Sequence, residues 1–267
     1  MEVNKVLMCA PTYFDIEYVI NPWMDTSNRV NKERAWQQWE YVRDVLTDLG
    51  VKIEYIDPVP GLPDMVFAGD AGMVSGKTFI ASNFRFSQRQ KEAEVASEWM
   101  AARGYEVIIP PEGVYFEGLG DVIYSDTNVL VGHGPRSSPD SVEFIQRIFK
   151  NLNIIGEVHL CDPWFYHTAL AAAFIGDNRI IYYAPALSPE SRQFVESKFD
   201  YRIAVSEQDA KQFMVCNNIV VGRKILVHDC TPQLEESLGE WGYDVIRCPA
   251  DEFLKSGGSV RCLILNL

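Results

Sequence analysis

The sequence lacks any apolar run long enough to cross a membrane. No stretch of its 267 residues approaches the roughly 18 uninterrupted apolar residues that a spanning helix needs, and the longest candidates, 169–175 and 180–187, are both interrupted. The N-terminal segment also has too short an apolar run for a signal peptide and soon becomes acidic. We therefore expect a cytoplasmic protein without a membrane partner.

Paired cysteine motifs are absent as well. The six cysteines are scattered along the chain without any C-x-x-C pair. In a chain of this length without a signal peptide, this distribution favours reduced thiols over a disulfide framework and gives no structural zinc site. His228, Asp229 and Cys230 are consecutive, but side chains that alternate along a strand cannot all reach one ion. We expect no metal.

Basic residues are scarce relative to acidic ones. The chain has 24 Lys and Arg against 37 Asp and Glu, for a net charge of −13. Such a surface repels a phosphate backbone, so we expect no nucleic-acid partner. It would mildly attract a small cation, although the same acidity is also what keeps many proteins in solution.

Phosphate-binding loops of the G-x-G-x-x-G and G-x-x-x-x-G-K-[ST] types are missing, and the sequence contains a repeat instead. A strand-like segment, an amphipathic helix and a second strand recur about every 50 residues. The predicted helices are 32–49, 90–103, 139–151, 189–199 and 232–241. The strand-like segments that flank them are 5–10 and 51–56, 65–81 and 105–109, 122–132 and 157–160, 170–183 and 201–205, and 215–227 and 243–247.

Helix boundaries in this repeat are well marked. Three helices are preceded by a hydroxyl residue and proline, at 138–139, 188–189 and 231–232, which is typical of an N-cap followed by the first helical position. Gly50, Gly104 and Gly242 follow the first, second and fifth helices and favour a left-handed residue that ends each one.

Five repeats favour a radial arrangement over an open doubly wound sheet. A single repeat cannot bury the face of its helix, so neighbouring repeats must stack around an axis. A final strand, 259–267, follows the turn at Gly257 and Gly258 and would complete the first unit, closing the ring. No linker or low-complexity segment divides the chain, which indicates one domain over residues 1–267.

A few residues could carry chemistry. Cys262 follows a glycine pair that would let the backbone approach a ligand, although most lone cysteines are buried structural thiols. His167 lies among aromatic and apolar residues, where a histidine is more often part of the core than a catalyst.

Carboxylates stand at corresponding points of two successive repeats. Asp64 and Asp70 lie in the second repeat, and Glu117 and Asp121 lie in the third, all flanked by small or apolar residues where an unpaired charge is costly. Each could simply cap a turn. Their equivalent positions favour a shared central site.

The order of these motifs resembles that of the guanidino-group-modifying enzymes of the pentein superfamily. These include arginine deiminases, dimethylarginine dimethylaminohydrolases, arginine dihydrolases and amidinotransferases. The resemblance covers nearly the whole chain and implies an α/β fold, a five-bladed propeller with its site on the central axis. Its motifs are C-A-P at 9–11 through Y-V-I-N-P-W-M at 18–24, L-P-D at 62–64 with Asp70, F-E-G-L-G-D at 116–121, G-H-G-P-R-S at 132–137, F-Y-H at 165–167 and G-G-S-V-R-C at 257–262.

The resemblance also implies roles for individual residues. Cys262 would be the nucleophile, His167 the acid–base residue and Glu117 a catalytic carboxylate on the guanidinium. The residues implied in substrate binding are Asp70, Asp64, Asn21, Arg136, Arg89, Asp121 and Phe67. The implied reaction is hydrolysis of a C–N bond in arginine or an N-methylated arginine, through an S-alkylthiouronium intermediate. It yields a ureido product and ammonia or an amine, with no cofactor. Related enzymes are often dimers, which leaves a homodimer open.

Four departures leave the substrate open. His167 is followed by Thr-Ala-Leu, whereas deiminases and amidinotransferases have a second aspartate there. Asp70 stands where the dihydrolase branch has asparagine, Gln88 where dimethylargininases have arginine, and Ile264 where Thr or Ser is usual. The alternatives are an ornithine-forming arginine dihydrolase, an amidinotransferase, and a non-catalytic binding module of the same fold.

Overall fold

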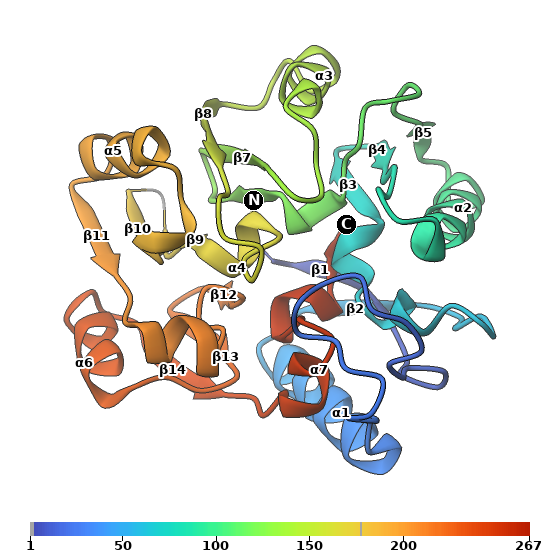
Figure 1. Ribbon diagram of the computed structural model, residues 1–267, viewed down its shortest axis with the longest axis horizontal. Coiled ribbons are helices and arrows are strands. Elements are labelled where there is room, and N and C mark those ends of the chain that lie inside the picture. Colours follow the sequence, from blue (N-terminus) through green and yellow to red (C-terminus); the bar gives the residue numbers. More distant parts are fainter. Residues whose placement is uncertain (1–2, 177) are drawn as a thin grey trace.

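The strands of this protein stand in five separate sheets around a common axis. The structure, a computed structural model, describes residues 3–176 and 178–267. Within these residues each sheet has three strands, and a helix covers its outer side (Figure 1). The radial arrangement predicted from the repeat is confirmed.

Each blade repeats one topology. Its inner strand runs antiparallel to the middle strand, and the middle strand runs parallel to the outer strand. From inner to outer strand, the blades are β15 (Leu265–Asn266), β1 (Lys5–Cys9) and β2 (Lys52–Ile56); β3 (Gly72–Ser75), β4 (Thr78–Ala81) and β5 (Glu106–Ile108); β6 (Val122–Tyr124), β7 (Val129–His133) and β8 (Ile154–His159); β9 (Ala172–Phe174), β10 (Arg179–Tyr182) and β11 (Tyr201–Ala204); and β12 (Ile219–Val221), β13 (Lys224–Val227) and β14 (Asp244–Arg247).

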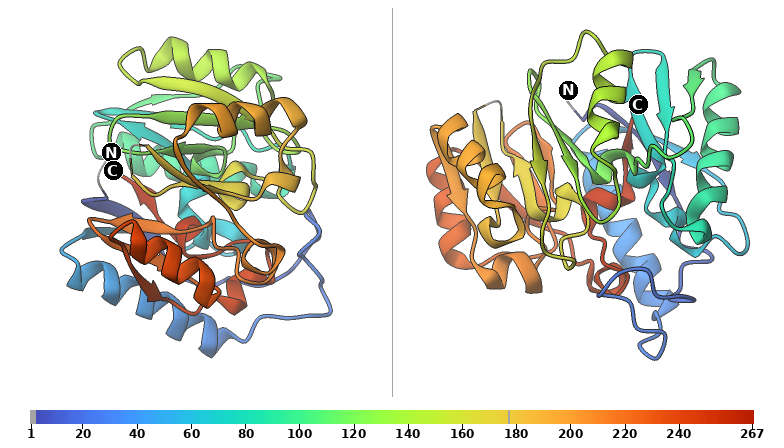
Figure 2. Two further views of the ribbon diagram at one scale, coloured as in Figure 1. Left: turned by 90° about the vertical axis from the view of Figure 1, so that its left-hand side faces the viewer. Right: turned by 45° about the horizontal axis from the view of Figure 1, so that its top comes forward.

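One helix in each blade connects the middle strand to the outer strand, as a parallel pair requires. These helices are α1 (Lys32–Asp48), α2 (Ser87–Ala101), α3 (Asp140–Ile148), α5 (Pro189–Lys198) and α6 (Pro232–Glu240). The side views in Figure 2 show them on the outside of the ring. Short helical turns lie elsewhere: η1 (Pro63–Val66), η2 (Ala68–Ala71), η3 (Gly118–Gly120), α4 (Thr168–Ala171), η4 (Ala184–Ala186), η5 (Gln208–Gln212), α7 (Asp251–Leu254) and η6 (Val260–Leu263).

The end of the chain closes the ring. β15 pairs antiparallel with β1, with Val6 opposite Asn266, and the Leu267 N–H donates to the Lys5 carbonyl at 2.9 Å. The first blade is therefore built from both ends of the chain, as predicted. The extent of the predicted final strand was wrong, because residues 260–263 form the 3₁₀ helix η6. The segments predicted as 65–81 and 170–183 likewise begin with helical turns before their inner strands.

Two of the three predicted hydroxyl caps are confirmed. The Ser188 and Thr231 side chains accept hydrogen bonds from backbone N–H groups three residues ahead, at 3.2 and 3.3 Å. Ser138 was predicted wrongly as a side-chain cap. Its hydroxyl instead accepts from the Tyr115 N–H at 3.1 Å and so links α3 to the preceding loop. Gly50, Gly104 and Gly242 have φ of 83°, 76° and 80°, the left-handed conformation expected where these helices end.

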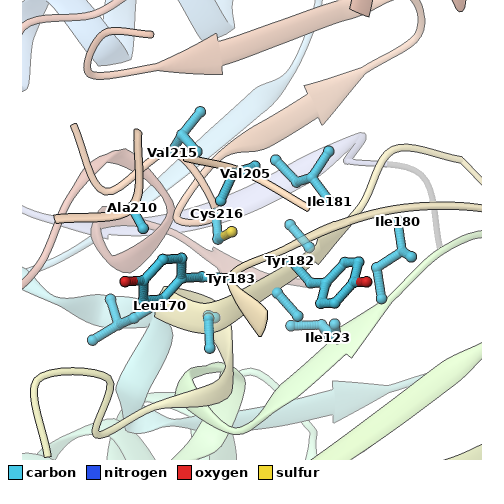
Figure 3. Packing of buried hydrophobic residues seen from close by; sticks show 14 of the residues in the cluster. Ile123, Leu170, Ile180, Ile181, Tyr182, Tyr183, Val205, Ala210, Val215 and Cys216 are labelled. Carbon is cyan, nitrogen blue, oxygen red and sulfur yellow. The ribbon is translucent and has the colours of Figure 1, made fainter. Parts of the chain in front are cut away.

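Apolar residues fill the spaces between blades. Figure 3 shows part of the largest cluster, to which Ile123 of the third blade, Leu170 and Tyr182 of the fourth and Val215 near the fifth all belong. Cys216 also lies in this cluster, and burial raises the pKa of its thiol. Among the described residues, no helix has the length and apolar character needed to cross a membrane.

Candidate active site

The candidate site forms where the chain enters each inner strand. Asp70 lies on η2 before β3, Glu117 precedes η3 and β6, and His167 precedes α4 and β9. Asn217 precedes β12, and Cys262 lies on η6 before β15. Every blade thus supplies a side chain from the segment that leads into its inner strand, and all five are buried. Because inner strands surround the axis, these side chains converge.

Glu117 and His167 form the central pair. The His167 Nε2 lies 2.9 Å from Glu117 Oε2. Burial opposes ionisation of Glu117, but Arg136 and His167 outweigh it and hold the pKa of this carboxyl well below its usual range. Since an ionised carboxylate only accepts, Nε2 is the donor. Gly120 permits this packing, because a Cβ there would lie 2.7 Å from the imidazole ring.

The other imidazole nitrogen is free of hydrogen bonds. His167 Nδ1 lies 3.9 Å from Asp70 Oδ1, too far for a hydrogen bond, and neither atom has a partner. Burial lowers the pKa of His167, but the charges of Asp70, Asp121 and Glu117 outweigh it and raise the pKa above 6.5. The site therefore favours the protonated ring relative to a free histidine, as a proton donor requires.

Cys262 is held as a protonated thiol. Burial, reinforced by the negative charge of Asp70, raises the pKa of Cys262 to about 12. Three interactions lower the pKa of Cys262: a backbone hydrogen bond with Ser259, a hydrogen bond from Asn217 and the charge of Arg261. The Asn217 amide nitrogen lies 3.2 Å from the sulfur and donates to it. The thiol would become a nucleophile once a cation enters beside it, because positive charge favours the thiolate.

Arg136 supports the central pair from the side. Its Nη1 donates to Glu117 Oε2 at 2.8 Å and its Nη2 to the Ile20 carbonyl at 3.0 Å. The guanidinium carbon lies 4.8 Å from the ring centre of Phe86 and 4.6 Å from that of Tyr166. Here Arg136 orients a site carboxylate, and its predicted grip on a substrate carboxylate stays a prediction.

Arg89 is more completely paired than the sequence suggested. Its Nε and Nη2 hold the Glu92 carboxylate at 3.1 and 2.8 Å, and its Nη1 donates to Asp70 Oδ2 at 2.7 Å. Nη2 also donates to the Asp64 carbonyl at 3.3 Å. Arg89 therefore fixes Asp70, leaving the second oxygen of that carboxylate directed at no protein donor.

Asp64, like Asp70, has one paired and one unpaired carboxylate oxygen. One oxygen accepts from the Tyr18 hydroxyl at 2.8 Å, and the other is buried without a partner. Burial raises the pKa of Asp64, with Arg89 and Tyr18 opposing it. Five buried carboxyl groups lie in this region together with two buried guanidinium groups and the His167 imidazole. The carboxylates are Asp64, Asp70, Glu92, Glu117 and Asp121, and the arginines are Arg89 and Arg136.

The remaining predicted residues have supporting contacts. Asp121 accepts from the Thr168 N–H at 3.0 Å and from the Ser137 hydroxyl at 2.6 Å, which fixes the turn after His167. The Asn21 side chain donates to the Ser256 carbonyl at 3.0 Å, next to the glycine pair. Phe67 packs edge-on against Phe14 with ring centres 5.5 Å apart. Their roles toward a substrate stay predictions.

Sequence reasoning missed three residues of this site: Asn217, Tyr18 and Arg85. The Arg85 N–H donates to Glu117 Oε1 at 3.1 Å and its Nε donates to the Arg136 carbonyl at 3.1 Å. Asn217 could have been found from the repeat, because it stands two residues before β12 as Asp70 stands two residues before β3. Tyr18 lies in the Y-V-I-N-P-W-M motif, whereas Arg85 has no such signal.

Five three-stranded blades around an axis lined by these buried polar residues define a pentein propeller. The family model for N,N-dimethylarginine dimethylhydrolase of eukaryotes matches residues 11–267, and the chain belongs to this family.

Two relatives with different named activities resemble this chain to a similar degree. The chain is 32% identical to the bifunctional arginine dihydrolase/ornithine cyclodeaminase ArgZ of Synechocystis over 98% of its own length, but it spans only 37% of that relative. It is 31% identical to the N(G),N(G)-dimethylarginine dimethylaminohydrolase of Mycobacterium tuberculosis, over 99% of this chain and 86% of the relative.

Solved structures agree with this assignment. A cysteine-to-serine mutant of the N-terminal domain of cyanobacterial ArgZ, bound to substrate, superposes with a TM-score of 0.92 at 32% identity, covering 98% of this chain and 97% of that one. A dimethylarginine dimethylaminohydrolase structure superposes with a TM-score of 0.78 at 19% identity, which supports the fold.

Proposed function

We propose that this chain is a cysteine-dependent hydrolase that cleaves a C–N bond of a guanidino substrate such as arginine or an N-methylated arginine. The observation that carries the proposal is a set of unpartnered atoms in the candidate site. Asp70 Oδ1, Asp64 Oδ1 and His167 Nδ1 are buried without hydrogen bonds. A substrate with a planar guanidinium and an α-amino group would satisfy the two carboxylate oxygens, with the guanidinium at Asp70 and the amino group at Asp64.

Binding of the guanidinium is the first step of the proposed mechanism. Asp70 and Glu117 orient the planar group so that its central carbon faces Cys262. The cation offsets the burial that keeps the thiol protonated, and the thiolate forms as the thiol proton passes to water. Attack of sulfur on the carbon then gives a tetrahedral adduct.

His167 moves the protons that follow. It donates a proton to the departing amine, which leaves as ammonia or an alkylamine, and a positively charged S-alkylthiouronium remains on Cys262. His167, now neutral, takes a proton from water as the water attacks the same carbon. Collapse of this second adduct breaks the C–S bond and releases a ureido product. Charge pairing with Glu117 and Asp70 suits the imidazolium required for the first transfer.

Recognition of the rest of the substrate is proposed to use the arginines and Asp64. Arg136 and Arg89 were expected to hold a substrate carboxylate, but both already bind carboxylates of the protein. Arg85 adds a further candidate for this role, because it contacts Glu117 and Arg136 and its side chain is exposed. Asp64 and Asn21 would hold an α-amino group.

A second candidate function is the arginine dihydrolase reaction, in which a second hydrolysis yields ornithine. The TM-score of 0.92 with an arginine dihydrolase domain favours it, and Asp70 disfavours it where that branch has asparagine. Residues 1–267 would then form one catalytic domain, as in that structure. A cytoplasmic location and a homodimer are further proposals.

Mass spectrometry of reaction products tests both candidates. The protein would be incubated separately with arginine, methylated arginines, agmatine and guanidino acids. A ureido product from one of them supports the single hydrolysis and identifies the leaving group. Ornithine from arginine supports the dihydrolase, and no product from any of them contradicts the proposed class.

A further inference from the structure

A cavity of about 350 Å³ lies at the mouth of the propeller opposite the candidate active site. The active-site residues precede the inner strands. Residues that line this cavity include Tyr124, Phe174 and Val221, the last residues of β6, β9 and β12. Val3 and Asn4, just before β1, complete its rim. We call it the rear cavity.

Arg261 connects the rear cavity to the nucleophile segment. It precedes Cys262 on η6, yet its side chain lines the rear cavity while the thiol contacts Asn217. Only 8% of Arg261 is exposed, and its Nε and Nη2 are buried without hydrogen-bond partners. The guanidinium carbon lies 5.2 Å from the ring centre of Tyr124. A cation held this way without an anion is costly, because its N–H groups have left water without replacement.

The free edge of Arg261 identifies the class of ligand. Nε and Nη2 present two parallel N–H groups, and a carboxylate accepts both at once. The protein uses this same edge twice: Arg29 holds Asp15 through Nε and Nη2 at 2.9 and 2.5 Å, and Arg89 holds Glu92 through these atoms at 3.1 and 2.8 Å. Arg261 is thus half of a pair whose carboxylate is supplied by no described residue.

The cavity walls favour an organic anion over inorganic phosphate. Apolar and polar side chains share the lining, and Tyr124, Ser125, Asn218 and Tyr243 place neutral polar groups beside Arg261. The apolar lining residues are Val3, Ile123, Ala173, Phe174, Val220 and Val221. Asp126 also lines the cavity and would repel a second negative charge. These features fit a singly charged carboxylate with a hydrocarbon or aromatic body.

We propose that the rear cavity binds a small organic monocarboxylate through the Nε–Nη2 edge of Arg261. This site is separate from the candidate active site, because the two lie at opposite ends of the inner strands. A ligand here would contact the residue next to Cys262, whose backbone N–H shares the Asn217 carbonyl oxygen with that of Cys262.

Binding of 4-fluorobenzoate, followed by ¹⁹F NMR at constant ionic strength, tests the proposal. We expect saturable binding to the wild-type protein and an increase in Kd of about tenfold or more in Arg261→Gln, because two charge-assisted hydrogen bonds are lost. Arg261→Lys should also bind weakly, since an ammonium group cannot form the bidentate pair. Arg136→Gln, which removes an arginine on the active-site side, should leave Kd unchanged.

A second variant tests the rear cavity independently, in case Arg261→Gln does not fold. Val221→Phe leaves the arginine in place but narrows the rear cavity, and it should weaken binding by a similar factor. The proposal is overturned if binding is not saturable, if Kd is the same in Arg261→Gln and Val221→Phe as in wild type, or if Kd depends on Arg136 instead. Displacement by inorganic phosphate at equal concentration would overturn the carboxylate assignment.

Discussion

The Asn217 amide nitrogen lies 3.2 Å from the sulfur of Cys262, and the oxygen of the same side chain holds the backbone around it. That oxygen accepts from the N–H groups of Ser259, Arg261 and Cys262 at 3.1, 3.2 and 3.3 Å. One side chain of the fifth blade therefore positions both the nucleophile and the turn that carries it. These three hydrogen bonds to Asn217 also explain why residues 260–263 form a helical turn instead of a strand.

Asn217→Ala is expected to lower kcat about tenfold or more. The variant loses a donor to the sulfur and leaves backbone N–H groups buried without an acceptor, each effect being worth about 1–3 kcal/mol. Because the Asn217 hydrogen bond lowers the pKa of Cys262, its loss should raise that pKa further. The rate of iodoacetamide alkylation as a function of pH measures this shift.

The matched control for Asn217 is Asn218→Ala. Asn218 is also buried, but its side chain donates to the Val215 and Cys216 carbonyls and not to the thiol. It should leave the pH profile of alkylation unchanged even if the protein becomes less stable. An identical profile in wild type and Asn217→Ala would show that Asn217 is a structural residue only.

Cys262→Ser is expected to abolish turnover while the far-ultraviolet circular dichroism stays that of the wild type. A hydroxyl is a much weaker nucleophile than a thiolate in this setting, and loss of a nucleophile typically costs about 10³-fold or more. Cys161→Ser is the control, because Cys161 is an exposed cysteine and should not affect activity. Wild-type activity in Cys262→Ser would disprove the mechanism.

Much of the fold could be predicted because its signals are local. Apolar periodicity, the glycines that end helices and the position of proline identified the five helices and the ring closure. The helical turns η2, α4 and η6 could not be predicted, since short apolar segments look alike whether they form strands or turns. Their conformation depends on partners distant in sequence, such as Asn217 for η6 and Asp121 for α4.

Residue roles were less predictable than residue positions. The resemblance grouped Cys262, His167 and Glu117 into one site; in the structure His167 contacts Glu117, and Cys262 contacts Asn217. The resemblance did not show that Arg89 pairs with Asp70 and Arg136 with Glu117, because partners 19 positions apart leave no trace in the spacing of residues. The same holds for Tyr18, which contacts Asp64 from 46 positions away.

The stability that His167 contributes should depend on pH in a defined direction. The folded state raises the pKa of His167 above 6.5 and lowers that of Glu117 below 4.5. The histidine contribution is therefore complete below pH 6.5 and is lost as pH rises through the folded pKa, while the glutamate contribution is lost as pH falls below 4.5. The pair should stabilise the protein most between these values.

Urea unfolding of wild type and His167→Gln at about pH 6 and about pH 9 measures this contribution. The difference in free energy of unfolding between the wild type and His167→Gln should be smaller at the higher pH. In a Glu117→Gln background the advantage should change less with pH, because a main partner of the imidazolium is gone. Glu117→Gln should also lose activity through poorer guanidinium binding. An advantage that grows with pH would contradict the charged pair.

Asp70→Asn is expected to shift the products formed from arginine toward ornithine. After one hydrolysis the carbon carries a carbonyl oxygen, which a carboxylate at position 70 repels and an amide N–H can bind. Asp70 Oδ1 is free of partners and Arg89 fixes the other oxygen, so the substitution changes charge with little change in shape. KM for arginine should rise about tenfold, because a charge-assisted hydrogen bond is lost.

Asp64→Asn is the control for Asp70→Asn. One oxygen of Asp64 pairs with Tyr18, and the substitution should raise KM for arginine without changing the ratio of products. Ornithine as the main product of the wild-type protein would show that the carboxylate of Asp70 does not prevent the second hydrolysis.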